Sequence, residues 1–197
     1  MKMSRLEKIL VNRPTKGMSN AAVVSRQLDT LGAPHIEEVL ELGCGVGEVT
    51  AFLAAQRGYN VVGADIDPAQ VALAASRYGA QRRLQFVVAD ASDLRFDTAR
   101  FDLVIAQNVF HHLPRWRRAV SEIARVLRPG GHVLWLDLTP PPLLKALLRP
   151  LRARAGVYTL TDVREAFRDE GFFEVAVRQT VPWLPIRHEL ILQKNPA

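Results

Sequence analysis

The chain has 197 residues and a formal net charge of +6, enough for one domain that buries roughly two thirds of its unfolded surface. Its single cysteine, Cys44, cannot form an intramolecular disulfide, so a secreted disulfide scaffold is excluded and a reduced, cytoplasmic setting is expected. The arginines are spread along the whole chain, so we expect no specific nucleic-acid partner. No apolar run reaches the roughly 18 residues of a membrane span. The apolar run near the N-terminus is interrupted at Glu7 and Lys8, unlike a signal peptide.

Residues 1–34 are predicted to form a helical cap. Apolar stripes over residues 6–10 and 24–31 predict two helices, the second of which ends at Gly32. Between them, residues 12–19 contain turn formers and two cations. This loop either folds over a ligand or only connects the two helices.

From residue 37 onward, short apolar runs alternate with amphipathic helices. This alternation is typical of βαβ units and predicts a parallel sheet covered on both faces. The helices are predicted over 68–78, behind an Asp67 N-cap, and from Pro114 to about Leu127. The turn 128–131 then leads into the fifth strand. The predicted strands are residues 39–42, 60–64, 84–89, 101–106 and 132–138.

The composition changes after the fifth strand. Residues 139–160 are rich in leucine and arginine and contain no acid. A helix over 161–170, ended by Gly171, and strands near 173–181 and 189–193 complete the chain. A proline-containing turn alone joins these two strands, which predicts an antiparallel hairpin at the sheet edge.

A glycine turn follows the first strand. Gly43, Gly45 and Gly47 stand at alternate positions between that strand and a helix. Glycine has no Cβ and can adopt φ > 0, so the turn is predicted to expose amide N–H groups beside the positive end of a helix. The dinucleotide fingerprint would place its third glycine at position 48, where Glu48 stands, so this turn departs from the nicotinamide pattern.

Acidic residues stand at or near the ends of the first three strands. In an open parallel sheet, ligands bind beyond the carboxyl ends of the strands. Asp65 closes the second strand, where a carboxylate can accept hydrogen bonds from a ribose diol. Asp90 closes the third strand and could accept from an adenine amino group. Glu41 lies under the glycine turn, where its charge would suit a cationic ligand. Each could also be an ordinary cap or loop acid.

Five segments together resemble a known family. They are ELGCGVG (41–47), VVGADIDP (61–68), FVVADASDL (86–94), FDLVIAQNVFHHL (101–113) and RVLRPGGHVLWLD (125–137). In this order they resemble the class I S-adenosylmethionine-dependent methyltransferases of the small-molecule and lipid type. The resemblance covers residues 37–138 and implies a Rossmann-like, doubly wound α/β fold. Its seven-stranded sheet would have the order 3-2-1-4-5-7-6, with the last strand antiparallel and helices at the N-terminus.

The resemblance also implies how the chain is divided and which residues contact the cofactor. The chain would be one domain (1–197): an N-terminal cap (1–34), a cofactor-binding core (37–138), a basic insert or lid (139–160) and a C-terminal helix with edge hairpin (161–197). The implied cofactor-binding residues are Glu41, Gly43, Cys44, Gly45, Gly47, Asp65, Ile66, Asp90, Ala91 and Gln107.

Each of these residues has an implied role. The glycines would pass under the methionine part and the ribose of S-adenosylmethionine, with Cys44 as a small packed residue among them and not a nucleophile. Glu41 would lie near the amino group, directly or through water, and Gln107 would lie near the methionine moiety. At the other end, Asp65 would bind the ribose hydroxyls and Ile66 would pack on the adenine. Asp90 and the Ala91 amide would read the adenine edge.

Methyl transfer requires alignment of donor and acceptor and exclusion of water, and no metal is expected. A general base is needed only if the acceptor is a hydroxyl or a carbon acid. His111 and His112 both follow the fourth strand and either could serve. The resemblance makes a structural role the alternative for His112.

The acceptor is expected to be a small, lipophilic molecule such as a quinone precursor or a phospholipid amine. Residues 143–152 form a basic amphipathic pattern that Pro150 would kink. This segment either contacts an anionic membrane and admits a lipophilic acceptor, or is a lid that packs its leucines on the core. The alternative function for the chain is a non-catalytic S-adenosylmethionine-binding module that regulates or scaffolds a partner.

Overall fold

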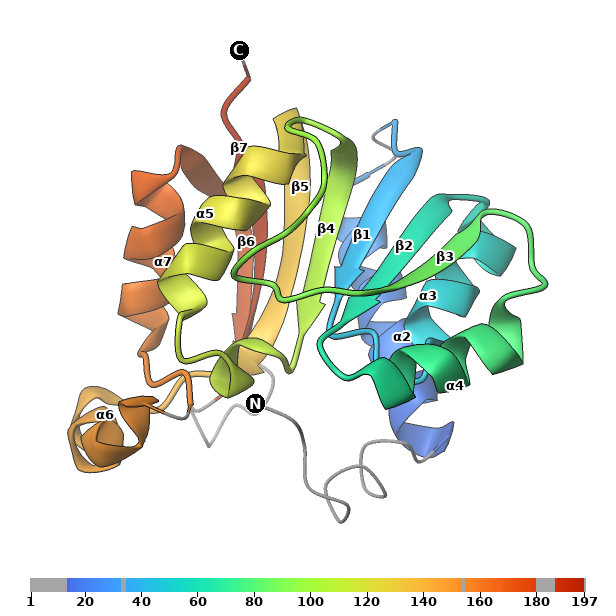
Figure 1. Cartoon of the computed structure of the whole chain (residues 1–197). Coiled ribbons are helices and arrows are strands. Elements are labelled where there is room, and N and C mark those ends of the chain that lie inside the picture. Colours follow the sequence, from blue (N-terminus) through green and yellow to red (C-terminus); the bar gives the residue numbers. More distant parts are fainter. Residues whose placement is uncertain (1–13, 33–34, 154, 180–186, 197) are drawn as a thin grey trace.

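A twisted sheet runs through the middle of the computed structural model, which describes residues 14–32, 35–153, 155–179 and 187–196 (Figure 1). The strands are β1 (Glu38–Leu42), β2 (Asn60–Asp65), β3 (Leu84–Val88), β4 (Phe101–Gln107), β5 (Leu127–Leu138), β6 (Phe172–Gln179) and β7 (Arg187–Lys194). Their order is β3-β2-β1-β4-β5-β7-β6. The first five strands are parallel, and β7 is antiparallel to both β5 and β6. The predicted order and the edge hairpin are confirmed.

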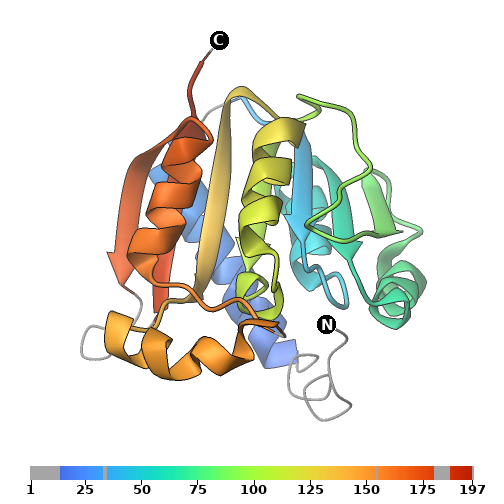
Figure 2. The ribbon, with the colours of Figure 1, turned by 60° about the vertical axis from the view of Figure 1, so that its left-hand side comes forward.

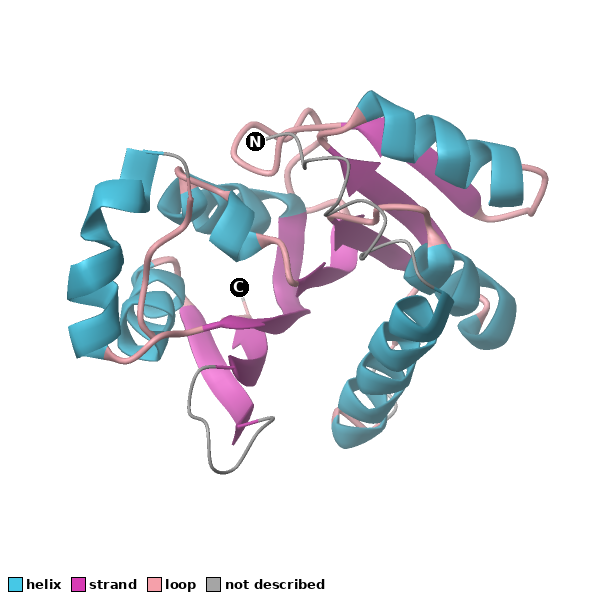
Figure 3. Cartoon of the chain, turned by 90° about the horizontal axis from the view of Figure 1, so that it is seen from below, coloured by secondary structure: helices cyan, strands magenta, loops and turns pink. Residues whose placement is uncertain are grey.

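Helices cover both faces of this sheet, as the view onto the strand ends shows (Figure 3). The α-helices are α2 (Pro14–Thr30), α3 (Glu48–Phe52), α4 (Pro68–Tyr78), α5 (Trp116–Val126), α6 (Pro142–Leu148) and α7 (Leu160–Asp169). A π-helical turn η1 (Leu53–Arg57) continues α3, and two 3₁₀ turns are η2 (Phe110–His112) and η3 (Arg149–Ala153). No helix in the described ranges is long and apolar enough to cross a membrane.

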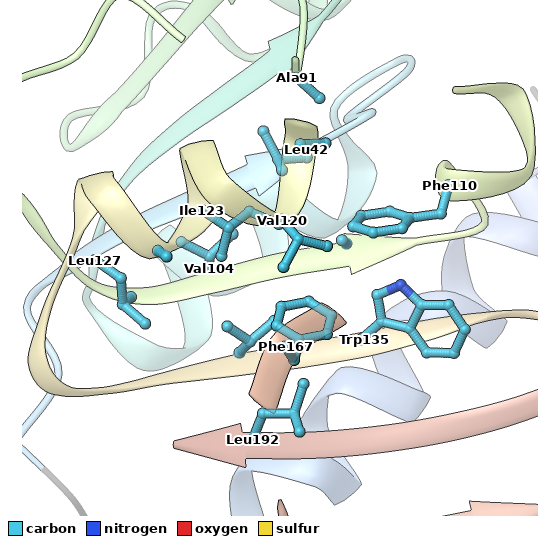
Figure 4. Packing of buried hydrophobic residues seen from close by; sticks show 14 of the residues in the cluster. Leu42, Ala91, Val104, Phe110, Val120, Ile123, Leu127, Trp135, Phe167 and Leu192 are labelled. Atoms are coloured by element: carbon cyan, nitrogen blue, oxygen red, sulfur yellow. The ribbon is translucent and has the colours of Figure 1, made fainter. Parts of the chain in front are cut away.

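Two hydrophobic clusters lie on opposite faces of the sheet because successive strand residues point to opposite sides. On one face, Val24 and Leu28 of α2 pack with Leu103 and Ile105 of β4. On the other face, α5 and α7 cover a larger cluster whose aromatic centre is Phe110, Trp135 and Phe167 (Figures 2 and 4). The central strands are buried on both sides, which explains their nearly continuous apolar runs.

Two element boundaries differ from the sequence prediction. The loop predicted over 12–19 is helical from Pro14, because proline lacks only an N–H that the first helical turn leaves unbonded anyway. Residues 6–10, predicted as a first helix, lie outside the described residues. The turn predicted at 128–131 lies inside β5, since Leu127 already pairs with Phe101 and a register shift follows.

The carboxyl ends of β1 to β5 meet at one edge of the sheet (Figure 3). Five connections start there: the glycine turn after β1, the Ile66–Asp67 turn after β2, the loop 89–100 after β3, η2 after β4, and the segment 139–141 that leads from β5 to α6. The fold therefore gathers the predicted site residues at this edge.

Candidate cofactor site and active site

The glycine turn is held by hydrogen bonds within the protein. The amides of Gly43 and Cys44 donate to the Ala64 carbonyl at 2.8 and 3.1 Å. The Gly45 amide donates to Asp65 Oδ2 at 2.9 Å, and the Gly47 amide to the Cys44 carbonyl at 2.9 Å. The prediction that the turn exposes its amides is therefore wrong for these four groups. The end of β2 lies against the turn and supplies the acceptors for the amides of Gly43, Cys44 and Gly45, while the Gly47 amide bonds within the turn.

The turn instead offers a ligand open space above Gly45. This residue has φ +53°, and a Cβ built on it would meet no atom within 4 Å. Gly47, at φ +82°, is needed for packing, because a Cβ there would lie 2.7 Å from the Phe86 ring. Of these two glycines, Gly45 is the one that lets a ligand approach the backbone.

Glu41 and Cys44 are buried beneath the turn. The Thr50 hydroxyl of α3 donates to Glu41 Oε2. Burial raises the pKa of Glu41 to about 8, although the Thr50 hydrogen bond opposes the shift. Burial also raises the pKa of the Cys44 thiol, with Glu41 and Asp65 adding to the effect, so the neutral thiol is a packing group. A nearby cation would favour the charged form of Glu41.

Asp65 ties the turn to the next helix. Its Oδ2 accepts from the Gly45 amide and its Oδ1 from the Asp67 amide, both at 2.9 Å. A carboxylate has about four acceptor sites, so a ribose diol would use those that remain. Asp67 in turn caps α4 by accepting from the Ala69 amide at 3.0 Å, as predicted from Asp67-Pro68.

A cavity of about 480 Å³ lies beside β3, lined by Ile66, Val87, Val88, Asp90, Phe96 and Arg100, among others. Ile66 is 40 % exposed at the cavity, although its side chain is apolar. Ile66 and Asp90, which the sequence analysis assigned to the adenine, both line this cavity. Ala91 follows Asp90 and is itself buried in the core.

Asp90 is already partly engaged. Its Oδ1 accepts from the Ser92 amide at 2.8 Å and the Ser92 hydroxyl at 2.7 Å, and its Oδ2 lies 3.1 Å from an Arg115 nitrogen. Burial alone would raise the pKa of Asp90, but these donors outweigh it and hold the pKa below its usual value. The carboxylate stays charged at neutral pH and can accept a further donor.

Gln107 carries two unsatisfied polar atoms at the end of β4. Both side-chain amide atoms are buried and have no hydrogen-bond partner among the described residues. Buried polar groups are normally hydrogen-bonded. The unsatisfied amide of Gln107 is therefore a group that a polar ligand could hydrogen-bond. Gln107, Gly45 and the cavity at Ile66 thus give the carboxyl edge an unsatisfied amide, an open stretch of backbone and an apolar space.

The two histidines differ in their surroundings. His111 Nδ1 lies 2.5 Å from Asp137 Oδ1, and the side chain of Asp137 is fully buried. Three backbone amides also donate to Asp137, those of Phe110, His111 and Leu138. Because every neighbour donates to this carboxylate, we assign the proton of the neutral ring to Nδ1, which leaves Nε2 as an acceptor. The ring centroid of His112 lies 4.0 Å from that of His111.

Asp137 and Tyr158 are site residues that the sequence analysis missed. Asp137 closes the fifth strand, so the rule that pointed to Asp65 also pointed to it. Tyr158 lies beside this carboxylate: burial, and secondly the charge of Asp137, raise the pKa of Tyr158 well above its usual value. Its hydroxyl keeps its proton at neutral pH and is not a base. No periodic signal marks Tyr158, because the chain returns to the site only after α6.

No group of three or more histidine, cysteine or acidic side chains that could hold a metal ion occurs in the part of the chain that the structure describes. The site is built instead from a glycine turn, single acids after successive parallel strands, an unsatisfied amide and a carboxylate-bound histidine. On this sheet order, that arrangement defines a class I S-adenosylmethionine-dependent methyltransferase domain.

Comparison with known proteins agrees with this class. Residues 40–135 match the family described as "Methyltransferase domain". An O-methyltransferase cnsE of Penicillium expansum is 36 % identical over 67 % of this chain and 56 % of its own length. A phthiotriol/phenolphthiotriol dimycocerosates methyltransferase of Mycobacterium leprae is 38 % identical over 53 % of this chain and 38 % of its own. A demethylmenaquinone methyltransferase of Clavibacter sepedonicus is 36 % identical over 54 % of this chain and 43 % of its own length.

A solved structure supports the fold as a whole. A SAM-dependent methyltransferase from Methanosarcina mazei has a TM-score of 0.71 at 22 % identity, covering 86 % of this chain and 98 % of that one. The chain spans between 38 and 56 % of the length of the three curated relatives above. Its matched segment, residues 40–135, is a class I S-adenosylmethionine-dependent methyltransferase domain.

Proposed function

We propose that the protein transfers the methyl group of S-adenosylmethionine to a small, lipophilic acceptor, and that His111 accepts the proton that the acceptor loses. The observation that carries this proposal is the 2.5 Å contact between His111 Nδ1 and the buried Asp137, at the carboxyl edge of the sheet. A base held in this way serves an acceptor that must lose a proton to react, which favours a hydroxyl or an acidic carbon.

The residues of the chain have distinct tasks in this proposal. When bound, S-adenosylmethionine supplies a methyl group made electrophilic by its sulfonium. Gln107 and Glu41 would hold its amino-acid end, Asp65 its ribose and Ile66 with Asp90 its adenine. His111 would orient the acceptor through Nε2 and take its proton, while Asp137 fixes the tautomer and the ring orientation.

The names of relatives support the acceptor class. Two of the curated relatives act, by their names, on phthiotriol or phenolphthiotriol dimycocerosates and on demethylmenaquinone, and a third is an O-methyltransferase. A quinone precursor, which offers hydroxyl groups and an acidic ring carbon, suits the His111 base better than the phospholipid amine that the sequence left open. A neutral amine attacks before it loses its proton and needs no base in that step.

The test is methyl transfer from labelled S-adenosylmethionine to a fractionated lipid and small-molecule extract. Once an acceptor is found, we expect His111→Ala to lower kcat/KM at least about 100-fold, as loss of a general base does. His112→Ala is the matched control and should change kcat/KM by less than about 10-fold. Both variants should still bind S-adenosylhomocysteine, which shows that the fold is retained.

Other outcomes would contradict the proposal. Equal losses in the two histidine variants would remove the special role of His111. Tight cofactor binding without labelled product from any fraction would favour the regulatory or scaffold module instead. Asp137→Asn should lower kcat at least about 10-fold with KM nearly unchanged, because it disturbs the base and not the acceptor contacts.

A further inference from the structure

Helix α6 exposes an apolar face at the carboxyl edge of the sheet. It lies beyond the ends of the parallel strands, at the lower left of Figure 1, and none of its residues is buried. Leu143 is 85 % exposed, Leu147 75 % and Leu151, in the following 3₁₀ turn η3, 51 %. A surface helix of a globular protein normally turns its leucines to the core. The expectation of a lid that packs these leucines on the core is therefore wrong for these three.

An ion pair holds this face outward. Lys145 Nζ lies 2.7 and 2.8 Å from the two carboxylate oxygens of Asp162, in the first turn of α7. On a helix, Lys145 lies about half a turn away from Leu143 and from Leu147, which are one turn apart. Since Lys145 is anchored to α7, the two leucines must face away from the body of the protein.

The charge around this face is positive. Besides Lys145, whose charge is paired with Asp162, the sequence between Leu138 and Thr161 contains three arginines, Arg149, Arg152 and Arg154, and no acid. Arg152 is exposed next to Leu151. Apolar side chains flanked by cations match the interface of an anionic bilayer, where leucines enter the acyl boundary and cations remain at the phosphates. A stable protein partner would need about 800 Å² on each side, which a two-turn helix does not offer.

We propose that α6 and η3 dock the protein on an anionic membrane surface, with Leu143, Leu147 and Leu151 in the bilayer interface and Arg152 at the headgroups. The purpose of this docking rests on the proposed function, since it would bring the active-site edge to a lipophilic acceptor. The contact itself needs neither acceptor nor methyl transfer, so the two proposals can fail separately.

The test is cosedimentation of the full chain with vesicles of phosphatidylcholine containing phosphatidylglycerol, at low and high salt. We expect binding that falls as salt rises and that is lost on vesicles of phosphatidylcholine alone. The double variant Leu143→Ser/Leu147→Ser should lower the partition coefficient about tenfold or more. Leu73→Ser is the matched control, because Leu73 is an exposed leucine, 37 % accessible, on α4. The control should bind vesicles like the parent chain.

Three results would overturn the proposal: no binding to anionic vesicles at low salt, equal binding by the parent chain and the double variant, or equal binding to neutral vesicles. If the chain does not bind anionic vesicles, sedimentation velocity tests whether a second copy of the chain covers Leu143, Leu147 and Leu151 instead. Self-association that the double variant abolishes would identify a second copy of the chain as the occupant. Retained binding of S-adenosylhomocysteine in every variant separates these results from misfolding.

Discussion

At the residue scale, the site depends on where single charges are buried. Glu41 has almost no exposure, and burial raises its pKa to about 8. Asp65 is buried too, but backbone amides of Gly45 and Asp67 donate to it. The two acids lie on either side of one turn and differ in the donors that surround them. Glu41 is therefore the one of these two acids whose raised pKa links proton binding to stability.

The raised pKa of Glu41 predicts how stability changes with pH. Between about pH 4.5 and pH 8, the folded chain keeps a proton on Glu41 that the unfolded chain has already released. Raising the pH across this window therefore removes the contribution of Glu41 to the free energy of unfolding. Glu41→Gln removes the titrating group. The midpoint temperature of thermal unfolding of the cofactor-free variant should therefore fall less with pH over that window than that of the parent chain.

The exposed Glu165 provides a control for this measurement. Glu165→Gln should leave the pH slope of the parent chain unchanged. An identical slope for the parent chain and Glu41→Gln would show that Glu41 is already charged in the folded state. The same Glu41→Gln change should also weaken S-adenosylmethionine binding, if the carboxylate meets the amino group as proposed.

Position along the chain predicted which acids lie at the carboxyl edge of the sheet, but not their hydrogen bonds. Asp65 and Asp90 follow from the rule that ligands bind beyond strand ends. The hydrogen bonds that the turn amides donate to Ala64 and Asp65 could not be predicted. These acceptors lie about 20 residues away along the chain, and their position depends on the register of β1 with β2. Asp137 was within reach of the rule, whereas Tyr158 was not.

At the element scale, α7 holds the region that follows α6. Its N-terminus is a capping box: Thr159 Oγ1 accepts from the Asp162 amide at 3.2 Å, and Asp162 Oδ2 accepts from the Thr159 amide at 2.6 Å. Asp162 also binds Lys145 of α6. A single carboxylate thus begins one helix and orients another.

Loss of this cap should be measurable. Thr159→Ala should lower the free energy of unfolding by about 1 kcal/mol, the usual effect of removing an N-cap oxygen. Thr161→Ala, at an exposed position two residues later, is the control and should change it by less than about 0.5 kcal/mol. Denaturant unfolding monitored by circular dichroism distinguishes the two, and equal effects would remove the capping box as the cause.

Element limits were predicted best where local chemistry sets them. Asp67-Pro68 fixes the start of α4, and Pro150 falls where α6 has given way to the 3₁₀ turn η3. The outward orientation of α6 could not be predicted, because the same leucine spacing suits either a lid or a surface helix. In the structure, the Lys145–Asp162 pair marks the side of α6 that faces α7.

At the scale of the whole molecule, cofactor binding and folding are linked. The proposed site joins the ends of β1, β2 and β4 with the loop after β3, so it exists only when the sheet is assembled. A ligand that binds the folded state alone at 100 times its dissociation constant stabilises it by about 2.7 kcal/mol. We expect S-adenosylhomocysteine to raise the free energy of unfolding by this amount.

Thermal unfolding with and without S-adenosylhomocysteine checks this expectation. Asp65→Asn should lose most of the stabilisation at the same ligand concentration. Asp169→Asn, at an exposed position at the end of α7, should keep it. If S-adenosylhomocysteine stabilised Asp65→Asn as much as it stabilises the parent chain, Asp65 would be excluded from the cofactor site.

The strand order was predicted because five sequence segments resemble one family, and the alternation of periods agreed with a parallel sheet. The two clusters on its faces then follow from residue alternation along β1 and β4. The acceptor could not be predicted, because the five segments that resemble the family carry the cofactor motifs and none of them covers residues 1–34 or 139–160, the parts of the chain expected to specify it.

The hydrogen bonds inside the glycine turn have a kinetic consequence. The turn from Gly43 to Gly47 is fastened to β2 by hydrogen bonds between groups of the protein itself, so we expect the entropy of ordering it to be lost during folding and not during binding. A preorganised cradle of this kind imposes no slow rearrangement on ligand entry. Spent cofactor and fresh cofactor should therefore exchange at a rate set by diffusion and by the lifetime of the bound contacts, without remodelling of the turn between turnovers.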